Sequence, residues 1–217
     1  MKIFALGLFF ALGALHLALV LWGSPRFQRI TKVLLLPPLV WYYGAAAETF
    51  LAVVLAAVIL GWIGDILLIK IENEAFFKAG LTSFLLGHLL YIPAMLSFAG
   101  TVRIPLLIIS IIAAIPLGIL IQRIVKPNKS LRIPVILYGI IIELMSLSAL
   151  QLMAARPEFW GILVFVGSLC FMISDSMLGY FTFRTLSKYG SFFIMFFYMI
   201  AQGTIIIGLA NLGPLSG

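Results

Sequence analysis

Long apolar runs separated by short polar segments dominate the sequence. About 20 apolar residues are enough to cross a bilayer as a helix, and the segments between the runs carry the Gly, Pro, Asn and charged residues typical of turns. The pattern predicts an all-α membrane bundle of eight transmembrane helices, over Ile3–Trp22, Thr31–Tyr43, Ala47–Ile69, Ala75–Phe98, Ile104–Ile121, Ile133–Met153, Phe159–Thr182 and Tyr189–Leu209.

The second of these spans is the shortest, and it contains Pro37 and Pro38. Proline has no backbone N–H and clashes with the preceding helical turn. A broken helix is tolerated at membrane depth where protein surrounds it. We therefore expect this span to be kinked or half-broken, and Pro116 to bend the fifth span.

Composition places the whole chain, 1–217, in a single integral membrane domain. The chain is 64% hydrophobic and only 10% charged, whereas soluble domains carry about 25% charged residues. The net charge of +7 is confined to short loops, which is a pattern that orients a membrane protein and does not suggest nucleic-acid binding. The single cysteine, Cys170, lies within a span, so no internal disulfide is expected.

The distribution of Lys and Arg predicts the orientation. The loops after the first, third, fifth and seventh spans hold eleven of the fourteen Lys and Arg residues, and the other side has only Lys2, Arg103 and Arg156. By the positive-inside rule these odd loops are cytoplasmic and both termini lie outside. The expected location is the cytoplasmic membrane of a bacterium.

A weak internal repeat accompanies this pattern. Four spans per half would give two halves of the same orientation, a parallel repeat. An offset of 110 residues relates Asp65 to Asp175, Lys78 to Lys188, Gly80 to Gly190 and His88 to Tyr198.

Asp65 and Asp175 are the strongest candidates for chemistry. Each lies near the cytoplasmic end of its span, about 6–12 Å inside the boundary at the rise of an α-helix. An acid within the membrane is costly unless it serves a function or finds a partner. Two carboxyl groups across one low-dielectric cavity would not both be ionised, which would provide an acid and a base for hydrolysis. The alternative is that each acid only hydrogen-bonds a neighbouring helix.

Further polar residues lie within the spans. His88 shares a helix face with Phe84 and Tyr91, and it is either a ligand for an acid or substrate, or a packing histidine. Tyr198 and Gln202 share another face, with a ligand or a neighbouring helix as equal alternatives.

Three more residues are candidates for the same cavity. Glu143 lies near the middle of the sixth span, with Tyr138 on its cytoplasmic side, and either lines the cavity or joins helices. Lys32 opens the second span, where it would bind a phosphate or extend to the interface.

No Gly-x-Ser-x-Gly, His-Glu-x-x-His or Walker motif is present. The two histidines, His16 and His88, are far apart, and no close His or Cys spacing suggests zinc. We therefore expect no metal and no cofactor.

The ordered set of these residues resembles the YhhN-like lysoplasmalogenase family over nearly the whole chain. Val33 departs from the pattern, because many members have proline after the lysine. The resemblance rests on Lys32, Gly64-Asp65, Gly80-x3-Phe84-x2-Gly87-His88-x2-Tyr91, Ser174-Asp175 and Tyr198-x2-Ala201-Gln202.

The resemblance implies an ether hydrolase that cleaves the vinyl ether bond of a lysoplasmalogen, releasing a fatty aldehyde and a glycerophospho-ethanolamine or glycerophosphocholine. Its partners would be the lysophospholipid substrate and membrane lipids. Asp65 and Asp175 would share the acid and base roles. The substrate would be bound by Lys32, His88, Tyr91, Tyr138, Glu143, Ser174, Tyr198 and Gln202.

Three other functions compete with this reading. A small transporter or lipid flippase fits the repeat and the broken second span. An intramembrane aspartyl protease is disfavoured because Trp62 replaces a glycine of its Gly-x-Gly-Asp motif. In a purely structural protein, the two aspartates would only hold helices together.

Overall fold

The structure, a computed structural model, describes residues 1–125, 131–182 and 187–214. Three of the loop cations counted above, Lys126, Lys129 and Arg184, lie outside these ranges. The described residues form α1 Lys2–Trp22, α2 Pro25–Leu34, α3 Pro37–Ala46, α4 Ala52–Leu67, η1 Leu68–Lys70 (a 3-10 helix), α5 Glu74–Ala99, α6 Ile104–Val125, α7 Arg132–Ala155, α8 Phe159–Thr182 and α9 Lys188–Ala210.

The predicted all-α membrane bundle is confirmed at this level. Within the described ranges, seven segments are long and apolar enough to cross a membrane, namely α1, α4 with η1, and α5 to α9. The protein is therefore a multi-pass membrane protein. The predicted span Thr31–Tyr43 is divided between α2 and α3, which have 10 residues each.

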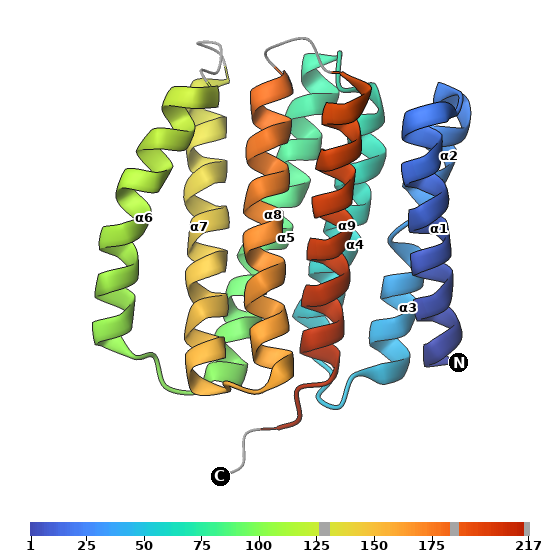
Figure 1. The fold of residues 1–217 in the computed structure, drawn as a ribbon. Coiled ribbons are helices and arrows are strands. Elements are labelled where there is room, and N and C mark those ends of the chain that lie inside the picture. The colour runs from blue at the N-terminus through green and yellow to red at the C-terminus, as the bar shows by residue number, and fades with distance from the viewer. Residues whose placement is uncertain (126–130, 183–186, 215–217) are drawn as a thin grey trace.

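The helices stand side by side in one bundle, with both chain termini at the same end (Figure 1). α6 forms one edge of the bundle, and α1, α2 and α3 form the other. Between these edges, α5 packs against α4 and α7, and α8 packs against α7 and α9. The carboxyl-bearing helices α4 and α8 thus both belong to the packed middle of the bundle.

The break between α2 and α3 follows directly from the two prolines. Pro37 has no N–H to donate to the carbonyl of Val33, the bond that a continuous helix would make at this point. Trp62 of α4 supplies the missing donor, because its Nε1 lies 2.7 Å from the Val33 oxygen. The side chains at the break, Leu35 and Leu36, are fully buried. The expected broken second span is therefore present, and α4 compensates for its lost hydrogen bond.

Glycines allow the close approach of the central helices, as is common in membrane bundles. A Cβ atom at Gly208 of α9 would lie 2.8 Å from the Trp160 carbonyl oxygen and 2.5 Å from Val164 Cγ2 of α8. A Cβ atom at Gly64 of α4 would lie 2.6 Å from the ring of Phe84 on α5. These contacts bring the backbones of the helices that carry Asp65 and Asp175 close to their neighbours.

α6 is packed differently from the other long helices. Of its residues only Ser110 and Val125 are buried, and its main neighbours are α7 and α8. Its exposed isoleucines, such as Ile109 and Ile112, form an apolar outer surface. In a membrane protein such a surface faces lipid.

We expect Gly208→Ala to destabilise the protein by about 1–3 kcal/mol, because the new methyl group meets a backbone oxygen that cannot move aside. Thermal unfolding in detergent measures this effect. Gly7→Ala in α1 is the matched control, because nothing lies within 4 Å of a Cβ atom at Gly7. Equal melting temperatures for both variants would contradict the predicted close contact.

Candidate functional site

Asp65 of α4 is held by partners from two other helices. Tyr198 of α9 donates its hydroxyl to Asp65 Oδ2 at 2.5 Å, and Lys32 Nζ of α2 lies 3.7 Å from Oδ1. The bonds continue from Tyr198, because Gln202 Nε2 donates to its hydroxyl at 3.5 Å and Tyr91 donates to Gln202 Oε1 at 3.4 Å. The carboxyl group is 2% exposed, so these groups replace the water that it would otherwise bind.

Asp175 of α8 is the centre of a second cluster. The hydroxyl of Tyr138 on α7 donates a short hydrogen bond to Asp175 Oδ2. His88 of α5 lies close to both groups, with its Nε2 3.6 Å from Asp175 Oδ2 and 3.1 Å from the Tyr138 oxygen. The other ring nitrogen of His88, Nδ1, is buried and has no hydrogen-bond partner among the described residues.

Two phenylalanine rings separate the Asp65 and Asp175 clusters. The ring of Phe171 lies edge-on to His88 at 4.6 Å and to Tyr198 at 5.6 Å, measured between centroids. Phe84 stacks on His88 at 6.4 Å and meets Tyr198 edge-on at 6.0 Å. The two carboxyl groups nevertheless interact electrostatically. The site is thus one aromatic wall with a carboxyl cluster on either side.

The clusters also show the internal repeat. His88 and Tyr198, which are related by the offset of 110 residues, each contact the aspartate of the other half of the chain. His88 lies beside Asp175, and Tyr198 bonds Asp65. Such a reciprocal exchange is the arrangement expected when two parallel halves pack about an axis along the membrane normal.

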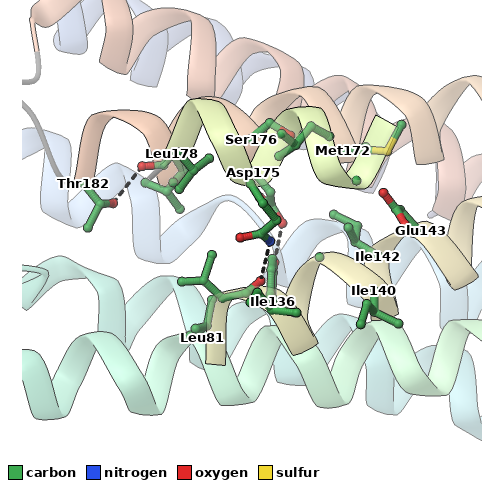
Figure 2. A pocket seen from close by; sticks show the side chains of 18 of the residues that line it. Leu81, Ile136, Ile140, Ile142, Glu143, Met172, Asp175, Ser176, Leu178 and Thr182 are labelled. Atoms are coloured by element: carbon green, nitrogen blue, oxygen red, sulfur yellow. Dashed lines mark hydrogen bonds between the residues drawn. The ribbon is translucent and has the colours of Figure 1, made fainter. Parts of the chain in front are cut away.

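A cavity of about 1150 Å³ lies between α5, α6, α7 and α8, and Asp175 and Tyr138 are on its wall. Figure 2 shows Asp175 near the middle, with Thr182 toward one end of the cavity and Glu143 toward the other. Most of the remaining lining is aliphatic, including Leu81, Ile136, Ile140, Ile142 and Leu178. The cavity therefore combines a carboxyl group with room for an apolar chain.

The comparison with known families supports the grouping of these residues. The sequence model of one family, described as the YhhN family, matches residues 24–209. The chain belongs to the YhhN family. The matched region includes both aspartates and every residue that contacts them. Neither a curated protein nor a solved structure matches the chain.

In this YhhN protein, the residues predicted as one site fall into two groups. Tyr138, Glu143 and Asp175 line the cavity, and His88 contacts two of them. Lys32, Asp65, Tyr91, Tyr198 and Gln202 form the buried cluster on the other side of the Phe84 and Phe171 rings and are not on the cavity wall. The aspartates are neighbours, as expected, but only Asp175 faces the cavity.

Ser174 has a structural contact. It is buried, and its hydroxyl donates to the Ile194 carbonyl oxygen at 3.0 Å, which joins α8 to α9. Its contribution is to fix the rotation of α8, and this rotation points the adjacent Asp175 toward α7.

Glu143 lines the cavity deeper than Asp175, as Figure 2 shows. Its carboxyl group lies over Gly118 of α6, where a Cβ atom would be 2.6 Å from Glu143 Oε1. It makes no hydrogen bond or ion pair with another described residue. Gly118 therefore leaves a space in α6 for this carboxyl group.

Sequence reasoning missed several residues of the site. Phe171 has no polar atom to mark it, and Trp62 was considered only for the protease motif that it disrupts. Arg123 and Arg132, which line the cavity, were counted only as charges that set the orientation. Within the described ranges, no group of three or more His, Cys, Asp or Glu side chains is arranged to hold a metal ion.

The arrangement is suited to acid–base chemistry on an amphiphilic ligand. Tyr138 occupies Asp175 Oδ2, so the other carboxyl oxygen is the one that can exchange a proton with a ligand. A proton-transferring side chain must come within hydrogen-bond reach of the reacting atom. Asp175 meets this requirement for a ligand in the cavity, whereas Asp65 acts on that ligand through its charge.

We expect the contact between Lys32 and Asp65 to stabilise the fold. Lys32→Met leaves a buried carboxylate without its cation, which is costly. In an Asp65→Asn background the same lysine substitution should cost less, with a coupling free energy of about 0.5–3 kcal/mol. Unfolding of the wild type, both single variants and the double variant in detergent measures this coupling, and purely additive effects would contradict the ion pair.

Proposed function

We propose that this YhhN protein is an ether hydrolase of the lysoplasmalogenase type. Its substrate would be a lysophospholipid with a vinyl ether chain, and its products a fatty aldehyde and a glycerophospho-ethanolamine or glycerophosphocholine. The observation that carries the proposal is Asp175, bonded by Tyr138 and close to His88, on the wall of a largely aliphatic cavity of about 1150 Å³. Family membership supports the same class of enzyme.

The first step of the proposed reaction is proton transfer to carbon. Protonated Asp175 gives its proton to the vinyl carbon that bears the alkyl chain, and the double-bond electrons form the new C–H bond. The carbon next to oxygen becomes an oxocarbenium ion, and Asp175 becomes a carboxylate. The hydrogen bond from Tyr138 orients the carboxyl group for this transfer.

Water then completes the hydrolysis. The Asp175 carboxylate accepts a proton from a water molecule as the water oxygen attacks the oxocarbenium carbon, which yields a hemiacetal. The hemiacetal loses its hydroxyl proton, the bond to the glycerol oxygen breaks, and that oxygen takes up a proton. No metal or organic cofactor is needed for these steps.

Asp65 would contribute by its charge. The carboxylate is held by Lys32 and Tyr198 behind the Phe84 and Phe171 rings, and it interacts electrostatically with Asp175. A fixed negative charge near a developing cation lowers the energy of the transition state in a low-dielectric site. The two aspartates would thus share the work, with Asp175 in contact with the substrate.

We also infer the orientation of the bundle. In Figure 1 both termini lie at the end opposite α2 and the α6–α7 connection. The described cations Arg26, Arg29, Lys70 and Lys78 belong to α2 and to the η1–α5 region, at the other end. By the positive-inside rule the basic end is cytoplasmic, so α2 and α3 together would make an eighth crossing.

The activity is tested with purified protein in detergent and a lysoplasmenyl-ethanolamine, with mass spectrometry for free fatty aldehyde. We expect aldehyde from the wild type, and a kcat lower by about 10²–10⁴-fold for Asp175→Asn, because the proton donor is lost. Asp65→Asn should also lower kcat, but by less. Glu72→Gln, an exposed acid outside the cavity, is the control and should keep full activity.

Full activity in a folded Asp175→Asn variant would overturn the mechanism. If the folded wild type releases no aldehyde, the proposed activity is wrong. In that case, movement of an unchanged lysolipid across vesicles would support the transporter alternative.

The orientation is tested with reporter fusions in a bacterial host. We expect a C-terminal alkaline phosphatase fusion to be active, because this enzyme folds only outside the cytoplasm. A fusion after Glu72, in the segment between η1 and α5, should be inactive. The reverse pattern would overturn the inferred orientation.

A further inference from the structure

Two arginines stand at the basic end of the cavity that contains Asp175. Arg123 is in the last turn of α6 and Arg132 is the first residue of α7, and both are among the lining residues. Both side chains are exposed, and neither forms an ion pair with an acidic side chain of the described chain. Guanidinium groups bind phosphate through paired hydrogen bonds, so this end of the cavity is suited to an anion.

We propose that Arg123 and Arg132 bind the phosphate group of the lipid substrate and thereby set the depth at which its ether bond lies. This inference rests on the proposed function and adds the subsite that recognises the headgroup. The first turn of α7 supports it, because Leu131 caps that helix without a side-chain hydrogen bond. The positive end of a helix attracts a phosphate.

The spacing along α7 matches the substrate. Tyr138, which bonds Asp175, lies nearly two turns deeper than Arg132 on the same helix, about 9 Å along its axis. The phosphate and the vinyl ether of a lysoplasmalogen are separated by one glycerol unit, an extended length comparable to this spacing. A phosphate held by the two arginines therefore places the vinyl ether beside Asp175.

The rest of the cavity fits the remaining part of the molecule. Beyond Asp175 the wall is formed by aliphatic side chains such as Ile115, Ile119 and Ile142, which suit a hydrocarbon chain. Lys32, the other candidate for the phosphate, is 3.7 Å from Asp65 and is not on the cavity wall. The arginine pair is thus the basic group on the substrate side of the aromatic wall.

Binding is measured with a saturated hexadecyl-ether lysophosphoethanolamine, which has no vinyl group to protonate and stays intact. We expect its dissociation constant for the Arg123→Gln/Arg132→Gln variant to rise at least about 10-fold, since two charge-assisted contacts are lost. Hexadecyl glycerol ether, which has the same chain without the phosphate, should bind the variant and the wild type equally. Inorganic phosphate alone should not compete, because the chain provides most of the affinity.

The matched control is Arg29→Gln on α2, an exposed arginine at the same end of the bundle that does not line the cavity. Its affinity for both lipids should equal that of the wild type. This control separates a specific phosphate site from general attraction of anionic groups to the basic end.

The inference is overturned if the phosphate-bearing ether binds the double variant as tightly as the wild type, if Arg29→Gln weakens binding equally, or if the wild type does not bind it. These binding results do not depend on turnover, so they are distinguishable from a failure of the proposed hydrolysis. Where aldehyde is released, the double variant should show a KM raised by about 10-fold or more for the phospholipid substrate. Its kinetics with an alkenyl glycerol should be unchanged.

Discussion

The structure depends on the cost of placing a carboxyl group inside the membrane. Asp65 is buried and can keep its place only because α2 and α9 bring a lysine and a tyrosine to it. These contacts join segments that are far apart in the sequence. The polar cluster therefore specifies how α2, α4 and α9 pack, whereas apolar contacts alone would leave several arrangements of similar energy in lipid.

The glycines and aromatic rings complete this arrangement. Gly64 precedes Asp65 and leaves space for the ring of Phe84, and Phe84 and Phe171 together form the wall between the two carboxyl clusters. The wall keeps the Asp65 cluster dry while Asp175 faces a cavity. Two aspartates at corresponding positions of a repeat thus acquire different surroundings, and different surroundings are what allow two like groups to take different roles.

Much of the fold could be predicted from the sequence because membrane helices are marked by length and hydropathy. The break at Pro37 could be predicted for the same physical reason, the missing N–H. The candidate residues Asp65, Asp175, His88, Tyr138 and Tyr198 could be found because polar groups are rare in apolar spans. Their division into two clusters could not, since it depends on the rotation of each helix, and a helix that is apolar all round has no periodicity to reveal its rotation. Arg123 and Arg132 were hidden among loop charges, because only the fold shows that they border the cavity.

The position of α6 has a consequence for how a ligand is supplied. The outer wall of the cavity is a helix that faces lipid on most of its surface, so an amphiphile arrives by lateral diffusion in the leaflet. Its availability is then a mole fraction in a two-dimensional solvent. Diluting it with inert lipid would lower occupancy of the cavity even when the total amount in the sample is unchanged. A released apolar product would return to the same leaflet, where it competes with fresh ligand for entry past α6.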